Sequence, residues 1–195
     1  MSTRQPLVVR DRFVVVIVDV QERLAAAMRR RDEVVRAASK LARSAALVGA
    51  PILVTRQNPE RLGGTVGELE EVLGRLAAEG ATVRVVDKTA FCCTSEDAFD
   101  AALRETGRTQ VVLAGMETHI CVAQAALALA FAGADVQVAA DATCSRAERD
   151  HAVTLDRLRA AGVTVTVSES VMYEAVGRAA TDEFRELLRI VKEAS

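Results

Sequence analysis

Three residues with different reactive groups stand where apolar segments of the chain end. Asp19 follows a β-branched apolar run, Lys88 follows a second such segment, and Cys121 comes shortly after a third. A thiol becomes a strong nucleophile when a base takes its proton or a cation holds it as thiolate. Asp19 has the chemistry of the base, and Lys88 that of the cation that stabilises the charged pair. The same two residues are compatible with a salt bridge that only ties loops together, and the pattern leaves both interpretations open.

Cys121 lies in the stretch VVLAGMETHICVAQAALALAF, residues 111–131, in which an apolar run, a glycine and an alanine-rich segment follow one another. Thr118 is a favourable N-cap residue, so His119 would be the first helical position and Cys121 would lie in the first turn. Unpaired N–H groups and the helix dipole favour thiolate there, which predicts a lowered pKa for Cys121. The alternative is a packing cysteine, because free cysteine is among the most buried residue types.

The apolar and amphipathic segments alternate as strand and helix along the whole chain. We expect strands at residues 13–18, 52–55, 82–86, 111–114, 135–140 and 163–167, and helices at residues 32–48, 66–78, 95–105, 119–131, 147–161, 169–176 and 182–192. Short connections between such units predict an α/β fold: a doubly wound, six-stranded, mostly parallel sheet of order 3-2-1-4-5-6, with helices on both faces. We expect one domain, residues 1–195, with Asp19, Lys88 and Cys121 at the carboxyl edge of its sheet.

The bulk properties of the chain exclude several other classes. The net charge of −2, with interspersed acids and bases, does not favour nucleic acid or an anionic membrane as partner. No apolar run is long enough to span a bilayer, and the start of the chain lacks a signal-peptide core. Four cysteines without framework spacing indicate a reducing cytoplasm, and two histidines leave little for a metal. The loop after the first strand lacks the G-x-G-x-x-G fingerprint of dinucleotide sites.

Four motifs occur in order along the chain: VVIVDVQERL with Asp19, VDKTAFCC with Lys88, AGMETHICV with Cys121, and DATCSR after the fifth strand. As an ordered set they resemble the isochorismatase-like cysteine hydrolases, a superfamily that includes nicotinamidases and N-carbamoylsarcosine amidohydrolases. The segments TRQNPERLGGTVGEL and SESVMYEAVG are most similar to the group called isochorismatase domain-containing proteins. The resemblance covers nearly the whole chain.

The resemblance implies a catalytic triad in which Asp19 is the base, Lys88 the electrostatic partner and Cys121 the nucleophile. It also implies a cis peptide bond between Met116 and Glu117, which directs the backbone amides of Glu117 and Cys121 at an oxyanion. Metal-dependent nicotinamidases carry histidines in the loop after the second strand, whereas residues 56–65 contain none. Isochorismatases proper lack the nucleophilic cysteine that this chain has.

These departures favour covalent hydrolysis of a small amide, imide or related C–N substrate, without metal or cofactor. We expect a cytoplasmic homo-oligomer whose partner is a small molecule, with no nucleic acid and no membrane. Two other hypotheses stay open: a non-catalytic binding or scaffold protein on the same fold, and a redox sensor in which Cys121 is oxidised reversibly.

Other residues receive smaller roles. Candidates for the substrate pocket are Gln57, Phe91, Met116 and His119. His119 is a poor candidate for the base of Cys121, because residues two apart at a helix start point in different directions. We expect His151 at the surface or an interface, and Cys92, Cys93 and Cys144 as packing residues, with Cys92 near the pocket.

Overall fold

The computed structural model describes residues 6–193 of the chain. Its six-stranded sheet has the order β3-β2-β1-β4-β5-β6, and every neighbouring pair is parallel, which confirms the predicted topology. The strands are β1 (Phe13–Val18), β2 (Ile52–Gln57), β3 (Val83–Lys88), β4 (Gln110–Met116), β5 (Asp135–Cys144) and β6 (Thr164–Thr166). No helix within these residues is long and apolar enough to cross a membrane.

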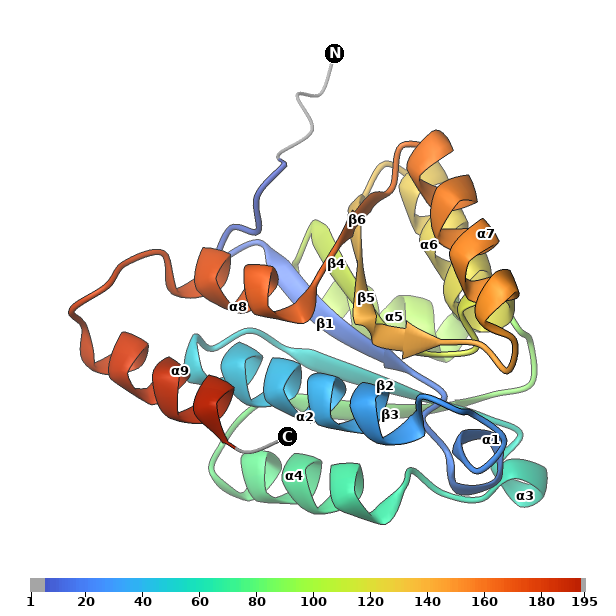
Figure 1. Ribbon diagram of the computed structural model, residues 1–195, viewed down its shortest axis with the longest axis horizontal. Coiled ribbons are helices and arrows are strands. Elements are labelled where there is room, and N and C mark those ends of the chain that lie inside the picture. The colour runs from blue at the N-terminus through green and yellow to red at the C-terminus, as the bar shows by residue number, and fades with distance from the viewer. Residues whose placement is uncertain (1–5, 194–195) are drawn as a thin grey trace.

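Helices cover both faces of the sheet (Figure 1). They are α1 (Glu22–Ala25), α2 (Arg31–Leu47), α3 (Pro59–Leu62), α4 (Gly67–Ala78), α5 (Asp97–Glu105), α6 (Ala123–Phe131), α7 (Glu148–Ala160), α8 (Ser168–Val176) and α9 (Asp182–Lys192), with single turns η1 (Cys93–Ser95) and η2 (Thr118–Val122). Helices α2, α4, α8 and α9 pack on one face, and α5, α6 and α7 on the other.

Burial on both faces of the sheet explains why the sequence of the central strand β1 is apolar without alternation. Phe13, Val15 and Ile17 belong to the core beneath α2, whereas Val14 and Val16 belong to the core beneath α6. Every residue of β1 is buried. Parallel strands covered on both faces read as continuous hydrophobic runs, because neither face meets water.

Gly115 lets β4 run past the end of β1. It pairs with Val18 in the sheet and has a φ of 118°. A Cβ atom on Gly115 would collide with the backbone of Val18, and L-residues rarely adopt such a φ. The glycine therefore allows the turn with Cys121 to begin directly beside the residue that precedes Asp19.

We expected the second strand to end at residue 55 and a loop to follow over residues 56–65, but the structure shows regular elements within that loop. Strand β2 continues to Gln57, and Pro59–Leu62 forms the short helix α3. Pro59 is its first residue, where the fixed φ suits a helix start and the missing N–H costs nothing. Strand β3 likewise extends to Lys88 itself, because Gln57 and Lys88 pair in the parallel ladder. The two extensions bring both side chains to the carboxyl edge of the sheet.

Candidate active site

Asp19 and Lys88 form a buried ion pair at the carboxyl edge of the sheet. Oδ2 of Asp19 lies 2.7 Å from Nζ of Lys88, and both side chains are 0% exposed. The other oxygen, Oδ1, accepts a hydrogen bond of 2.7 Å from the hydroxyl of Thr55 at the end of β2. Asp19 itself has a φ of 53°, as the chain leaves β1. Both charges are buried away from water, and each is stabilised there by the opposite charge of its partner.

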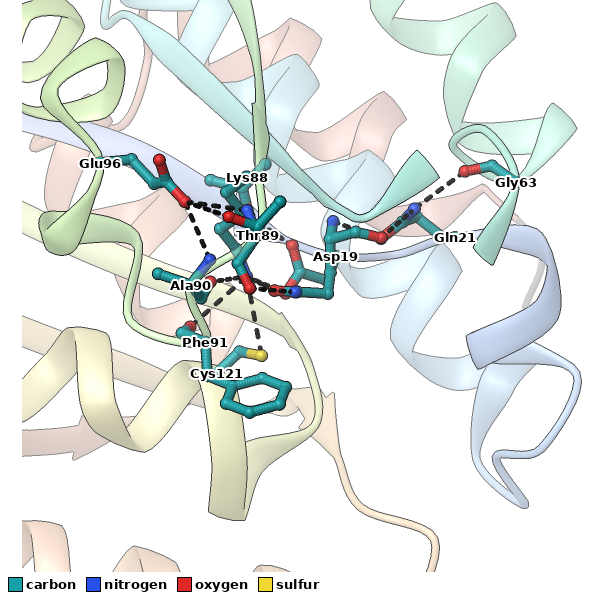
Figure 2. Close-up of polar contacts among 11 residues, drawn as sticks. Asp19, Gln21, Gly63, Lys88, Thr89, Ala90, Phe91, Glu96 and Cys121 are labelled. Atoms are coloured by element: carbon teal, nitrogen blue, oxygen red, sulfur yellow. Dashed lines mark hydrogen bonds and ion pairs between the residues drawn. The ribbon is translucent and has the colours of Figure 1, made fainter. Parts of the chain in front are cut away.

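The ammonium of Lys88 is surrounded by acceptors (Figure 2). Besides Asp19, Nζ donates to Oε1 of Gln57 at 2.6 Å and to the carbonyl of Ala90 at 3.2 Å. The sulfur of Cys121 lies 3.7 Å from the same nitrogen. An ammonium has three hydrogens to donate and no lone pair. Lys88 thus donates to Gln57 and Ala90 and forms an ion pair with Asp19. It is placed as a cation beside the thiol rather than as a proton acceptor.

Gln57 uses both ends of its side-chain amide inside the protein. While Oε1 accepts from Lys88, Nε2 donates to the carbonyl of Thr89 at 2.7 Å. The backbone of Gln57 is held in turn by Gln21, whose Oε1 accepts from its N–H at 2.7 Å and whose Nε2 donates to its carbonyl at 3.1 Å. Gln57 was expected at the substrate pocket, but these bonds make it part of the frame that orients Lys88. Gln21 was not expected at the site.

The turn that carries Cys121 differs from the predicted helix start. Residues 118–122 form a π-helical turn in which the carbonyl of Glu117 accepts from Ile120 at 3.1 Å and from Val122 at 3.3 Å. Thr118 is not the N-cap, because its hydroxyl is paired with His151 at 2.9 Å instead of with a backbone N–H of the turn. The Thr118 hydroxyl, which the sequence pattern assigned to the helix cap, instead makes a tertiary contact with His151. π-turns of this kind occur often at functional sites.

Burial raises the pKa of Cys121 to about 12, with the Asp19 carboxylate adding to the rise and Lys88 opposing it. The prediction of a lowered pKa is therefore wrong for this structure. Desolvation and a neighbouring carboxylate both disfavour the thiolate, and together they outweigh the ammonium and the turn. At neutral pH Cys121 carries its proton, next to a carboxylate that can receive it.

The peptide bond between Met116 and Glu117 is cis, the isomer that the resemblance implies. Beyond it, the Glu117 side chain is buried, and its Oε2 accepts from the backbone N–H of Arg146 at 2.9 Å and from Nε of Arg146 at 3.1 Å. Met116 was expected in the pocket, but it packs in the core beneath α2 and α8, on the other face of the sheet from Cys121. Arg146 was not expected at the site.

The two histidines both bond to groups other than the thiol. Nδ1 of His119 lies 2.9 Å from the hydroxyl of Ser145. His151 was expected at the surface, but it is only 4% exposed. It lies in the first turn of α7 and contacts Thr118 and Arg30. Its position four residues into an amphipathic helix gave no signal for this, because the contacting groups come from distant segments.

The site is covered within the chain. Cys121 is 5% exposed and Lys88 3%, while the nearby Phe91 is 58% exposed. The carbonyl of Phe91 lies 3.4 Å from the Lys88 ammonium. A cavity of about 610 Å³ lies at the opposite edge of the sheet, lined by residues such as Gly49 and Gly80, and contains none of the three strand-end groups. Within residues 6–193, no group of three or more histidine, cysteine or acidic residues could hold a metal.

Comparison with known proteins now adds to this geometry. The family model described as Isochorismatase domain matches residues 13–170. The chain belongs to the isochorismatase family. Isochorismatase domain-containing protein 1 of Salmo salar is 37% identical over 175 residues, which cover 89% of this chain and 59% of that protein. The chain thus spans less than two thirds of the length of this family member.

Solved structures of the isochorismatase fold agree closely with this one. A MAR1 ribonuclease from Caenorhabditis elegans superposes with a TM-score of 0.86 at 26% identity, over 96% of this chain and 93% of that one. The YcaC gene product of Escherichia coli, described as an octameric hydrolase of unknown specificity, superposes with a TM-score of 0.81 at 23% identity, over 97% and 92% of the two chains. The second likeness concerns the fold alone.

Proposed function

We propose that this isochorismatase-family chain is a cysteine hydrolase that cleaves a small amide, imide or related C–N bond without metal or cofactor. One observation carries the proposal: a fully buried Asp19–Lys88 pair, 2.7 Å apart, with the Cys121 sulfur 3.7 Å from the same ammonium. Burying two charges costs several kcal/mol per ion, so a pair that only joined loops would gain little from being here. A nucleophile with its base and its cation justifies that cost.

The first step joins Cys121 to the substrate. Asp19 takes the thiol proton as the sulfur attacks the carbonyl carbon, so that a C–S bond forms and the carbonyl π electrons move to oxygen. The cation of Lys88 offsets the negative charge that moves from sulfur toward the carboxylate. We assign the backbone N–H groups of Glu117 and Cys121 to the oxyanion. In support, Cys121 lies in the turn of residues 118–122 that directly follows Glu117 at the end of β4.

The second step releases the nitrogen and restores the enzyme. The tetrahedral intermediate collapses, the C–N bond breaks, and protonated Asp19 gives its proton to the leaving nitrogen. A thioester remains on Cys121. Water then attacks it, Asp19 takes one proton from that water, and the thiol leaves with a proton as the carboxylic acid forms. The thiol that ends the cycle is the protonated form favoured by its raised pKa.

Other functions are supported less well. A scaffold would not need a buried charge pair at a thiol. A redox switch would not need the Asp19 carboxylate, which raises the pKa of Cys121 and so disfavours the thiolate that is oxidised. The C. elegans protein is described as a ribonuclease. That activity fits poorly with the net charge of −2 in this chain, since nucleic-acid binding needs neutralised phosphates, and with a thiol as the central group.

We extend the proposal to one cytoplasmic domain of residues 1–195. We also propose a homo-oligomer, for which the E. coli octamer is a precedent on this fold.

Screening small primary amides, cyclic imides and N-carbamoyl compounds for ammonia or acid release tests the proposal. Cys121→Ala should abolish release of product while the protein stays folded. The matched control is Cys144→Ala, which removes a buried sulfur at the end of β5 without touching the ion pair, and it should retain activity. Wild-type turnover by Cys121→Ala would overturn the proposed mechanism.

A further inference from the structure

His151 and Thr118 form a buried polar contact behind the turn that carries Cys121. Nδ1 of the His151 ring lies 2.9 Å from Oγ1 of Thr118, and Nε2 lies 3.3 Å from Nη1 of Arg30. His151 is 4% exposed and Thr118 0%. The three groups come from the first turn of α7, from the nucleophile turn and from the residue before α2. None of them has a part in the proposed chemical steps.

Arg30 decides which ring nitrogen of His151 carries the hydrogen. A guanidinium only donates, so Nε2 must accept from it. The neutral ring then has its hydrogen on Nδ1, which donates to the hydroxyl oxygen of Thr118. Arg30 is itself held by two bonds to Glu33, of 2.8 and 2.6 Å. A clamped cation thus fixes the tautomer that makes His151 a donor to the turn.

We propose that His151 is a positioning residue for the Cys121 nucleophile and acts through the Thr118 hydroxyl; this inference rests on the proposed hydrolase function. The backbone of the turn is closed by i→i−5 bonds, from Val122 to Glu117 and from Ala123 to Thr118. Such wide turns are rare and lack the regular ladder of an α-helix. The bond from His151 ties the first residue of the turn to α7 and so fixes the turn relative to Asp19 and Lys88.

The charges around the ring make this contact depend on pH. Burial, and then Arg30, lower the pKa of His151, while Glu148 and Glu33 oppose the change. Cys144, at the end of β5, also faces Arg30, and burial raises the pKa of its thiol to about 12, so it stays neutral. A second proton on His151 would turn its Nε2 toward Arg30 as a donor. Nδ1 keeps its hydrogen in the protonated ring, but two cations then face each other at 3.3 Å. The ring is therefore held in place at neutral pH and is pushed from its position as pH falls below the ordinary histidine value of about 6.5 and through the lowered one.

Two variants separate the two hydrogen bonds of the ring. The amide nitrogen of His151→Asn takes the place of Nδ1 and keeps a donor for Thr118, whereas His151→Gln places its amide near Nε2 and loses that donor. We expect His151→Gln to lower kcat about tenfold or more with KM nearly unchanged, because small displacements of a nucleophile are costly. His151→Asn should stay near the wild type. Thr118→Val, which removes the hydroxyl, should lower kcat by a similar factor. Thr118→Ser, which keeps the hydroxyl, should retain the wild-type kcat.

Iodoacetamide provides a measurement that needs no substrate. Cys121 is 5% exposed, so a loosened turn uncovers it, and peptide mapping should find alkylation of Cys121 about threefold faster or more in His151→Gln. As pH falls below neutral, the smaller thiolate fraction lowers the alkylation rate of Cys121 in every variant. In the wild type, but not in His151→Asn, the rate should fall less than thiol ionisation alone predicts once the ring is protonated.

The experiments test the positioning role of His151 and the proposed hydrolase function separately. Equal Cys121 alkylation and equal kcat in wild type and His151→Gln, each folded by circular dichroism, would overturn the positioning role. Wild-type ammonia release by Cys121→Ala would overturn the proposed function, while the alkylation rates would still decide whether His151 positions the turn.

Discussion

The sulfur of Cys121 lies 3.7 Å from the ammonium of Lys88, yet the thiol pKa is raised to about 12. Burial is the larger influence, and the carboxylate that neutralises Lys88 adds to it. The resting site therefore stores the proton on sulfur, with the base beside it. Reactivity is expected only when an electrophile reaches the sulfur and the proton can move to Asp19 in the same event.

This relationship predicts the order of alkylation. At neutral pH, iodoacetamide should modify the partly exposed Cys92 before Cys121, because the thiolate is the reactive form and Cys121 is both buried and protonated. The rate at Cys121 should rise as pH increases toward the raised pKa. Peptide mapping by mass spectrometry after brief treatment measures both. Fastest labelling of Cys121 at neutral pH would contradict a protonated resting thiol.

Asp19→Asn should abolish turnover yet speed alkylation of Cys121. The neutral amide cannot accept the thiol proton, so catalysis stops, whereas removal of the carboxylate takes away one cause of the raised thiol pKa. Steady-state assays and peptide mapping on the same sample test both directions. Retained turnover would return the Asp19–Lys88 pair to a purely structural role.

Lys88→Ala should lose about 10²-fold or more in kcat/KM and about 3–5 kcal/mol of unfolding free energy, because Asp19 is left buried without its partner. Arg56→Ala provides the matched control, since it breaks the neighbouring ion pair with Asp87, in which the side chains are 30% and 49% exposed. An exposed pair contributes about 0–1 kcal/mol. Urea unfolding of both variants measures the difference, and similar losses would show that burial does not set the cost.

Gly115→Ala should lower the unfolding free energy by about 2 kcal/mol or more and disturb catalysis, because the added Cβ meets the backbone of Val18 at a φ of 118°. Gly74→Ala in α4 is its control. That position has nothing within 4 Å of the added Cβ, so the helix should gain up to about 1 kcal/mol. Thermal or urea unfolding gives both values, and a tolerated Gly115→Ala would mean that β4 can move away from β1.

Dialysis against EDTA should leave the rate unchanged, whereas iodoacetamide carried to completion should abolish it. Catalytic zinc usually takes three protein ligands, most often histidines, and the two histidines of this chain bond to Ser145 and to Thr118 with Arg30. Enlisting Asp19 and Cys121 as ligands would remove the base and the nucleophile. Loss of activity on chelation, restored by zinc or iron, would contradict the metal-free mechanism.

The alternation of apolar and amphipathic segments was enough to predict the sheet order and the bounds of β1. It was also enough to predict that Asp19, Lys88 and Cys121 meet at one edge, because parallel strands joined by helices end on the same side. These features follow from periodicity within short segments, which is a property of neighbouring residues. The ordered motifs added the family, which the match over residues 13–170 bears out.

Only the tertiary structure decided the state of the thiol and the partners of the polar groups. Thr118 looks like a helix cap in sequence, but it bonds to His151, 33 residues away. Gln57 orients Lys88 across 31 residues. The pKa of Cys121 depends on how much water its surroundings exclude and on Asp19, far away in the chain. Desolvation and hydrogen-bond pairing are set by atoms that approach only when the sheet and its helices are packed together, and no local pattern records them.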